Sequence, residues 1–312
     1  HFALGNLFRR RGEYERAVRV HEHLLSRGDL SLADRQRAQH ALALDYLKAG
    51  LLDHAEAALL KLEDTPFEGQ ARLALLANYE RSRDWTHAAL IAQKLEHSNQ
   101  GSFRGRLAHY LCEQAAAFIT HQELEQARFL LQEAIKTAPA AARPRIDLAR
   151  LLASQGKTED AYHELEEALA SSPAAIPLMA GPLAEFAVAC GRSHDALELL
   201  KTNYELFPSL DVLDAIVALE ATVEGPSPTA RDWYVRHLER EPSLVAAAKW
   251  IAGEKLEHEQ FHPQVQRALD HAVKPLTRYR CAACGFEAKQ HFWQCPGCQA
   301  WDSYPARRVE EL

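Results

Sequence analysis

Four cysteines near the C-terminus carry the residue type and the spacing most able to do chemistry in this sequence. They form two Cys-x-x-Cys pairs, Cys281/Cys284 and Cys295/Cys298, with ten residues between the pairs. A two-residue gap lets one tight turn direct both sulfurs toward one point, and a second turn completes a tetrahedron. Four thiolates in this geometry bind a structural zinc or a single iron ion. The sequence therefore predicts one Fe or Zn ion held by these four cysteines.

Two disulfides are the alternative use of the same four cysteines. A small oxidised domain at the end of a long helical chain requires an oxidising compartment. The two remaining cysteines, Cys112 and Cys190, stand alone within helical patterns. A free cysteine in such a position usually acts as a small buried apolar residue. That usage is typical of a reducing compartment, so the metal is favoured over the disulfides.

The composition is that of a folded protein without a strong charge. The 312 residues are enough for one elongated domain or for two to three compact ones, and 47% of them are apolar. The net charge of −7 argues against a protein that coats nucleic acid. No run of about 18 apolar residues and no signal peptide are visible. The chain begins at His1 inside a helical pattern, so we expect a fragment of a longer protein in which an anchor or signal could precede it.

Residues 1 to about 242 repeat a unit of two helices. Each unit is aligned on the residue that ends its first helix, and an alanine follows five residues later. The units recur every 33 to 39 residues, which is the period of the tetratricopeptide repeat. The seven aligned pairs are Gly12/Ala17, Gly50/Ala55, Arg83/Ala88, Gln122/Ala127, Gly156/Ala161, Gly191/Ala196 and Gly225/Ala230.

Each part of the unit has a physical role. The turn residue is expected to take the left-handed conformation that ends the first helix, and the alanine to lie where the second helix crosses the first. Side chains such as Tyr46 and Tyr79 are expected to fill the space between the helices. Because one unit cannot bury its apolar face alone, the units must stack into a right-handed superhelix. Proline ends the second helix of four consecutive units. These prolines are Pro139, Pro173, Pro208 and Pro242.

The predicted fold class is therefore all-α, a solenoid of about seven to eight helix pairs followed by a small metal domain. Residues 243–257 and 263–274 are predicted to form a last, degenerate pair that caps the solenoid. Pro275 ends this pair, so the repeat array is assigned to residues 1–274 and the metal-binding domain to residues 275–312. No window before residue 243 alternates with period two, so no strand is expected there.

The metal must hold the last segment together, because about forty residues are too few for a self-sufficient core. Aromatic side chains cluster in this segment after the helical periodicity has ended. We expect these rings to pack around the metal site and against the last helices of the array.

The concave groove of a tetratricopeptide stack is lined by the first helix of each unit. By position in the repeat, six polar or cationic residues are expected on it. Several cations on one inner face would suit an acidic peptide or a carboxylate. Ordinary solvated side chains explain the same residues equally well, because surface ions alone are weak evidence. The six residues are Asn6, Arg9, Lys48, Arg81, Arg143 and Arg150.

No catalytic constellation is present in the sequence. Gly156-Lys157-Thr158 ends like a phosphate-binding loop, but the position five residues before Gly156, which that motif requires to be glycine, is Leu151. None of the 16 histidines forms a His-Glu-x-x-His motif, and no pair of carboxylates falls in a predicted cleft. We therefore expect a protein that binds other proteins and that is not an enzyme.

Taken together, these features resemble one bacterial family, lipopolysaccharide assembly protein B. The resemblance covers the whole chain, and its tail motif is highly specific, whereas the repeats alone would fit thousands of proteins. The opening His1-Phe2-Ala3-Leu4-Gly5 is similar to the family's first repeat. The tail residues that carry the resemblance are Arg278-Tyr279-Arg280-Cys281-Ala-Ala-Cys284-Gly285-Phe286, Trp293-Gln-Cys295-Pro-Gly-Cys298 and Ala300-Trp301.

The resemblance implies an N-terminal membrane anchor that is not part of this sequence, a long repeat array and a rubredoxin-like metal domain. It implies an adaptor on the cytoplasmic side of the bacterial inner membrane that regulates lipopolysaccharide synthesis. Such proteins help a membrane ATP-dependent protease degrade the deacetylase that commits carbon to lipid A, and a second inner-membrane protein antagonises them. No nucleic-acid partner is implied, and a homodimer is left open.

The metal domain departs from a true rubredoxin in one respect that bears on its role. Rubredoxins usually carry glycine after each cysteine pair, which frees backbone N–H groups to hydrogen-bond to the sulfurs. Gly285 fits this pattern, whereas Gln299 stands at the second position, where a left-handed conformation costs about 1–2 kcal/mol. The ten-residue spacer is also shorter than that of a rubredoxin. A structural ion is therefore favoured, iron by the resemblance and zinc equally by its chemistry.

Two other functions compete with the adaptor. A rubredoxin-like electron carrier fused to a protein-binding array is the alternative that the four sulfurs suggest. A zinc ribbon that binds nucleic acid is disfavoured, because residues 275–312 hold five Lys/Arg against four Asp/Glu. So balanced a segment does not form a phosphate-binding surface.

Overall fold

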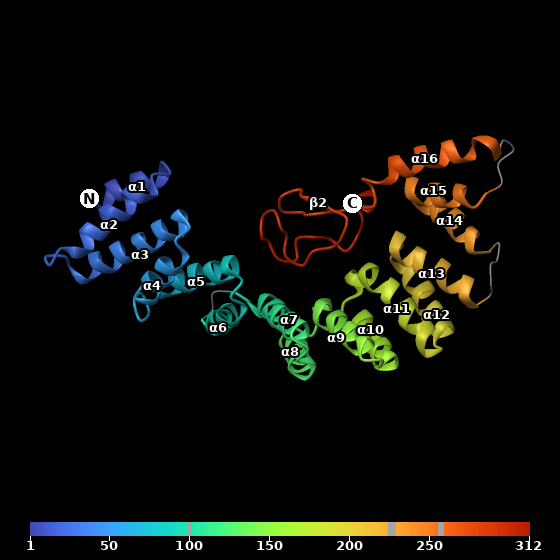
Figure 1. Ribbon diagram of the computed structural model, residues 1–312, viewed down its shortest axis with the longest axis horizontal. Coiled ribbons are helices and arrows are strands. Elements are labelled where there is room, and N and C mark those ends of the chain that lie inside the picture. The colour runs from blue at the N-terminus through green and yellow to red at the C-terminus, as the bar shows by residue number, and fades with distance from the viewer. Residues whose placement is uncertain (99–100, 224–228, 255–258) are drawn as a thin grey trace. The chain divides into compact units, whose positions relative to one another are not determined.

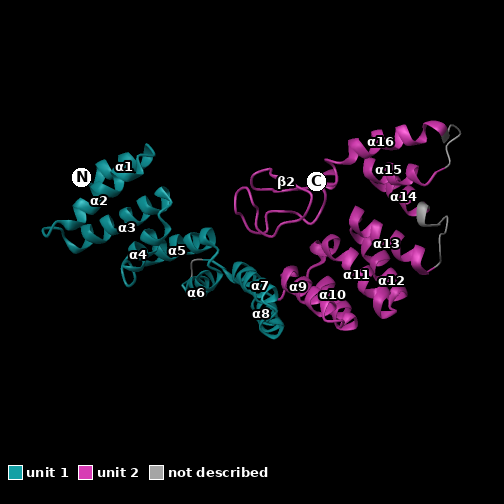
Figure 2. Ribbon diagram, in the orientation of Figure 1, with its two compact units in different colours: residues 1–138 teal, residues 139–312 magenta. Residues whose placement is uncertain are grey.

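The computed structural model describes residues 1–98, 101–223, 229–254 and 259–312, and its helices follow one another in pairs (Figure 1). The chain forms two compact units, His1–Ala138 and Pro139–Leu312, and each is described by itself (Figure 2). The predicted fold class, tetratricopeptide-type helix pairs followed by a small cysteine-rich domain, is confirmed. No strand occurs in the described part of residues 1–242, as predicted.

Unit 1 consists of four helix pairs. Each helix packs against the next one along the chain, so that every pair is covered by its neighbour. The helices are α1 Phe2–Arg10, α2 Tyr14–Ser26, α3 Leu32–Ala49, α4 Leu52–Leu60, α5 Glu68–Ser82, α6 Trp85–Glu96, α7 Arg104–Thr120 and α8 Leu124–Thr137.

Unit 2 continues in the same way and ends in the cysteine-rich segment. Its α-helices are α9 Ala142–Ser154, α10 Thr158–Ser171, α11 Ile176–Cys190, α12 Ser193–Leu206, α13 Leu210–Val223, α14 Thr229–Arg240, α15 Leu244–Ala252 and α16 His262–Val273. The shorter elements are the 3-10 turns η1 Pro173–Ala175, η2 Glu259–Phe261 and η3 Val309–Glu311, and the strands β1 Tyr279–Arg280 and β2 Glu287–Ala288.

The predicted capping pair corresponds to α15 and α16, although α15 ends five residues before the predicted end of its helix. Residues 255–257 of that prediction lie outside the described residues. The proposed boundary at Pro275 falls just after α16, and the assignment of residues 1–274 and 275–312 to separate domains stays a prediction.

The residues predicted to end the first helix of each repeat adopt a left-handed backbone in all six repeats where the structure describes them. Four of them are glycines, and the other two are Arg83, with φ of 57°, and Gln122, with φ of 62°. The alignment, and not the residue type, therefore identified the turn. Gly225 lies outside the described residues.

The alanines five positions later are completely buried in the same six repeats, as expected for a helix crossing. Tyr46 and Tyr79 are buried as well, and each phenol donates a hydrogen bond to a glutamate on the second helix of the preceding repeat. Tyr46 bonds to Glu22 at 2.6 Å and Tyr79 to Glu56 at 2.8 Å. These side chains therefore fill space and also link one repeat to the next.

One segment, Pro173–Cys190, is long and apolar enough to cross a membrane by length and composition, with a mean hydropathy of 1.4. The sequence pattern had suggested that no such segment exists. In the structure, residues 176–190 form α11, which packs against α10, α12 and α13. Met179, Ala180 and Leu183 on this helix are fully buried. In this structure the segment therefore contributes one helix to the packed interior of unit 2.

A buried polar network joins the first two helix pairs of unit 1. The imidazole Nδ1 of His21 lies 2.5 Å from one carboxylate oxygen of Asp45, and Arg9 donates to the other oxygen at 2.8 Å. Neither His21 nor Asp45 is exposed to solvent. Gly5 makes room for this arrangement, because a Cβ atom at Gly5 would lie 2.5 Å from the His21 ring.

The Gly5→Ala substitution should therefore destabilise the first helix pair by about 1–3 kcal/mol, because the ring or the helix backbone must move. Hydrogen exchange of the α1, α2 and α3 amides would measure the loss. Gly105→Ala on α7 is the matched control, because nothing lies within 4 Å of its added Cβ. Equal protection in the two variants would contradict the close approach.

Candidate metal centre

Two short turns present the four cysteines. The first turn connects β1 to β2, which pair antiparallel with Tyr279 opposite Ala288. Within it, the Cys281 N–H donates to the Phe286 carbonyl at 2.9 Å, and the left-handed Gly285 reverses the chain with φ of 78°. Cys281 is buried and Cys284 is exposed.

The second turn repeats this design between Gln294 and Trp301, which form an antiparallel bridge. The Cys295 N–H donates to the Ala300 carbonyl at 2.9 Å. Gln299 takes the position equivalent to Gly285 and has φ of 62°. The departure noted in the sequence is therefore real: a non-glycine residue adopts the left-handed conformation here.

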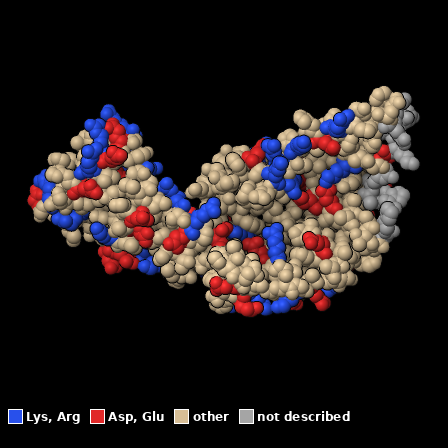
Figure 3. Space-filling view, in the orientation of Figure 1, with Lys and Arg blue, Asp and Glu red and all other residues tan. Residues whose placement is uncertain are grey.

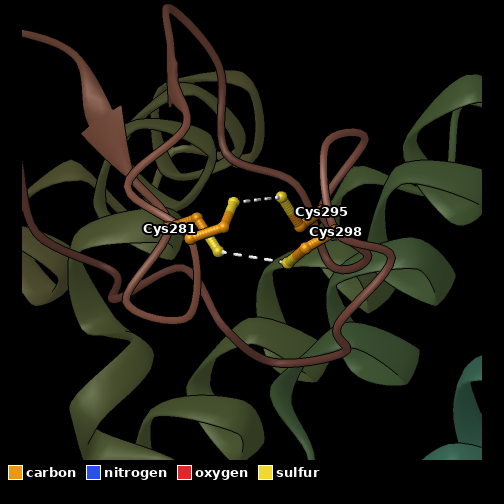
Figure 4. A group of neighbouring side chains, drawn as sticks. Cys281, Cys295 and Cys298 are labelled. Atoms are coloured by element: carbon orange, nitrogen blue, oxygen red, sulfur yellow. Dashed lines mark hydrogen bonds between the residues drawn. The ribbon is translucent and has the colours of Figure 1, made fainter.

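The two turns bring the four sulfurs together (Figure 4). All four Sγ atoms lie within 4.8 Å of one another. The Cys281 and Cys298 sulfurs are 3.8 Å apart, and the Cys284 and Cys295 sulfurs are 3.7 Å apart. These separations exceed a disulfide bond of about 2.05 Å, so none of the four cysteines is in a disulfide.

The site fits a tetrahedral metal ion. Zinc–sulfur bonds of about 2.3 Å place the sulfurs at the corners of a tetrahedron about 3.8 Å apart, and the two closest pairs have this separation. A donor set made only of thiolates suits zinc and iron and does not suit calcium or magnesium. Cys281, Cys284, Cys295 and Cys298 could thus hold a metal ion, and its identity as Fe or Zn stays a prediction.

The surroundings of Cys281 favour its thiolate. Burial alone would raise its pKa, but the hydrogen bond between its sulfur and the Ser303 hydroxyl and the hydrogen bonds from the backbone N–H groups of Cys284 and Ala283 lower the pKa to about 6. The Ser303 Oγ atom lies 3.2 Å from the Cys281 sulfur. The thiolate is the form that binds metal ions, so the backbone turn prepares this ligand.

Cys295 is prepared in the same way, since the N–H groups of Cys298 and Gly297 lower its pKa against the effect of burial. Cys284 behaves in the opposite sense. The Phe286 N–H lowers its pKa, but burial and the neighbouring sulfurs raise it to about 12. Thiolates this close repel one another unless a cation lies between them, which is the charge balance that a bound metal ion provides.

Aromatic side chains pack beside the sulfurs, as predicted. Tyr279 and Tyr304 form a buried cluster with Cys281 and Cys295, and Leu178 of α11 packs against it. His291, a conceivable alternative ligand, is engaged elsewhere, because its Nε2 atom lies 3.1 Å from the Tyr304 carbonyl oxygen. The cysteine-rich segment therefore packs on α11 of unit 2.

Comparison with known proteins agrees with this arrangement. The family described as rubredoxin metal binding domain matches residues 279–304, and the tetratricopeptide repeat family matches residues 118–181. Lipopolysaccharide assembly protein B of Escherichia coli (strain K12) is 28% identical over 319 residues, which cover 100% of this chain and 82% of that protein. The chain is thus similar over its whole length to lipopolysaccharide assembly protein B.

One further curated protein and one solved structure also match the chain. Lipopolysaccharide assembly protein B of Haemophilus influenzae is 28% identical over 314 residues, which cover 96% of this chain and 77% of that protein. Among solved structures, a chain of "Structure of Naa15/Naa10 bound to HypK-THB" aligns over 88% of this chain and 41% of its own length. Its identity is 15% and its TM-score is 0.49, a likeness too slight to support an argument.

In this chain the repeats precede the metal-binding segment, and the residues after the cysteines attach residues 275–312 to the array. Arg308 forms two hydrogen bonds to Asp211 of α13, at 2.7 and 2.9 Å, and its guanidinium lies 4.1 Å from the centre of the Tyr279 ring. Burial alone would lower the pKa of Arg308, but Asp211 raises it. Arg308 thus connects α13 to the strand that precedes Cys281.

Two glutamates cap helix N-termini of the array. The Glu310 carboxylate accepts from the N–H of Leu244 at 2.7 Å and from the Ser243 hydroxyl at 2.8 Å, at the start of α15. The Glu311 carboxylate accepts from the N–H of Leu210, at the start of α13, at 2.9 Å. A carboxylate at a helix N-terminus satisfies free N–H groups and interacts favourably with the helix dipole.

These docking residues were not identified from the sequence. Asp211 and Arg308 are separated by 97 positions, and no periodic pattern connects them. The only local signal was the pair of adjacent acids, Glu310 and Glu311, after the last aromatic residue. Ser303 also carried no signal, because its place beside Cys281 depends on how the two turns fold against each other.

The six residues expected on the groove lie on the first helices of their units, as their repeat positions require. Two of these six residues already form ion pairs with carboxylates of the same chain. Arg9 pairs with Asp45, and the nearly buried Arg143 pairs with Asp147 at 3.2 Å. Their use in binding a partner stays a prediction, but these two arginines already have a structural role.

The remaining groove candidates are more accessible. Asn6 accepts a hydrogen bond from Arg9 at 2.5 Å, and Arg81 donates to the Leu47 carbonyl at 3.1 Å. Lys48 is exposed, and Arg150 lies 3.6 Å from Asp147 with 59% of its side chain exposed. Figure 3 shows that cationic and acidic residues are interspersed over the visible face. The arrangement does not single out a strongly basic groove.

Cys281→Ser or Cys298→Ser should release the ion and unfold residues 275–312 while most of the helical signal survives, because the metal replaces a core in that segment. Metal content by mass spectrometry, limited proteolysis of the tail and circular dichroism would measure this. Cys190→Ser, outside the cluster, should change none of the three. Unaltered protease protection of the tail in the ion-free variants would show that the metal is not structural.

Glu310→Ala should loosen the tail without releasing the ion, because it uncaps α15 at a cost of about 1 kcal/mol. The expected result is faster hydrogen exchange at the first turn of α15 and in residues 305–312. Glu239→Ala, an exposed acid on α14, serves as the control. If the two variants exchanged alike, the capping contact would have no energetic role.

Proposed function

We propose that this chain is an adaptor of lipopolysaccharide assembly that acts by binding proteins along its helix pairs. The observation that carries the proposal is the match over the whole chain to proteins named lipopolysaccharide assembly protein B, together with the order of repeats and metal domain. Within the described residues, the four cysteines are the one cluster able to hold a metal ion. Their thiolates complete a coordination shell and leave no position for a substrate, which suits a structural ion in a protein that is not an enzyme.

The finer part of the proposal follows from the family resemblance. The chain would work on the cytoplasmic side of the bacterial inner membrane, held by an N-terminal anchor. It would present the lipid A pathway deacetylase to a membrane ATP-dependent protease, and a second inner-membrane protein would oppose it. The repeat array offers protein-binding surface for such a role, since tetratricopeptide stacks form extended concave surfaces.

In this proposal the metal domain stabilises the C-terminal end of the array. Its backbone N–H groups and Ser303 hold the sulfurs ready, and the ion supplies the positive charge that balances them. Arg308, Glu310 and Glu311 then fix the domain to α13 and α15. The end of the array is thereby kept in one conformation for its partners.

Depleting the protein in cells should lengthen the half-life of the lipid A deacetylase and raise its level, because the protease would lose its adaptor. Pulse-chase immunoblotting would measure the half-life. Re-expression of the anchored full-length protein should restore turnover. Deacetylase turnover that is the same with and without the protein would refute the adaptor function.

An electron carrier is the second candidate, and the exposure of Cys284 and Cys298 favours it, because an exposed edge of the site permits electron transfer. This function requires iron that cycles reversibly. Metal analysis and voltammetry of the purified protein decide between the two. A colourless, zinc-loaded and redox-silent protein would eliminate the carrier and leave the adaptor in place.

A further inference from the structure

A pocket of about 510 Å³ lies where the metal domain meets α13 and α15, away from the four cysteines. Its walls come from the array, from the end of α16 and from the metal domain, all within unit 2. Five cationic side chains from distant parts of the sequence converge on it. They are Lys249, Lys274, Arg278, Lys289 and Arg308.

Two acidic residues line the same pocket, and each is already paired. Asp211 binds Arg308 at 2.7 Å, and Asp214 forms an ion pair with Lys249. The five cations and two carboxylates leave a net lining charge of 5 − 2 = +3. This excess stands out in a chain whose net charge is −7.

Three of the five cations, Lys274, Arg278 and Lys289, are not paired with either carboxylate that lines the pocket. Arg278 approaches Glu287 only to 3.7 Å, and the same carboxylate is bound by Arg280 at 2.8 Å. Within the part of the chain that the structure describes, the ammonium groups of Lys274 and Lys289 have no ion-pair partner. Like charges directed at one cavity repel, so an anion between them would remove an unfavourable interaction.

We propose that this pocket binds a compact anion that carries one or two phosphate groups. Lysine ammonium groups and arginine guanidinium groups are the side chains that bind phosphate oxygens most strongly. The volume is in the range of small-molecule sites, about 300–1,000 Å³. A cavity of this size is too small for an extended peptide, which makes a soluble phosphate ester or a phosphorylated lipid headgroup the better occupant.

The pocket also connects the ligand to the metal domain. Lys249 belongs to the array, whereas Arg278 and Lys289 belong to the segment that carries the cysteines. A ligand that binds only the docked arrangement stabilises it by mass action. Occupancy would therefore tighten the attachment of residues 275–312. This inference stands apart from the adaptor function, and it can fail without affecting deacetylase turnover.

The test uses the metal-loaded protein and the Lys274→Gln/Lys289→Gln double variant. Lys61→Gln/Lys157→Gln is the control of matched charge, because both lysines are exposed and lie outside the pocket. Calorimetry with inorganic phosphate and with fructose 1,6-bisphosphate measures binding in solution. Sedimentation with phosphatidylcholine vesicles, with and without phosphatidic acid, measures binding to a lipid headgroup. Circular dichroism and metal content verify that each variant is folded.

The double variant should lose at least about tenfold in affinity in whichever arm shows binding, and the control should lose much less. Binding in solution alone identifies a metabolite, and binding to phosphatidic acid vesicles alone identifies a lipid headgroup. Hydrogen exchange of the unmodified protein should also slow at residues 274–289 when the ligand is present. No binding in either arm, or an equal loss in the two variants, would overturn the proposal.

Discussion

The apolar face of each helix pair must be covered by the next pair, and this stacking governs the rest of the structure. Completely buried alanines at the crossings allow the helices to approach closely, and tyrosine–glutamate hydrogen bonds connect neighbouring units. A stack of this kind has two ends at which no further pair follows. At the C-terminal end, α16 contains no buried residue, so this last helix does not close the stack by its own packing.

The cysteine-rich segment covers this end of the stack through two kinds of interaction. Inside the domain, ligation of a metal ion by the four sulfurs would replace the hydrophobic core that so short a segment cannot form. Between the domain and the array, apolar contact at Leu178 is supplemented by charge. Glu310 and Glu311 bind to helix N-termini, and Arg308 binds Asp211. A bound ion would order the segment, and the carboxylates and guanidinium of residues 308–311 place that segment on α13 and α15.

Local chemistry and periodicity were enough to predict most of the fold and the metal site. The turn positions at Arg83 and Gln122 were found by alignment, although neither is glycine, because the repeat fixes the backbone whatever the residue. The four cysteines were found by spacing. Contacts such as Arg308–Asp211 could not be found in this way, since they depend on how distant segments fold together. The same limit explains why Arg9 was assigned to a groove: its partner Asp45 lies one helix pair further along the chain.

Gln299 shows how relative magnitudes decide the character of the metal site. Its left-handed backbone costs about 1–2 kcal/mol, whereas a structural zinc supplies about 10–16 kcal/mol in small metal-dependent domains. The strain is therefore small beside the energy of ligation, and the turn forms despite it. A non-glycine residue at this position leaves the hydrogen bond from Gln299 N–H to the Cys295 carbonyl intact at 2.8 Å. The turn thus tolerates a departure from the rubredoxin pattern at a modest energetic cost, which favours the structural ion that we propose over one tuned for electron transfer.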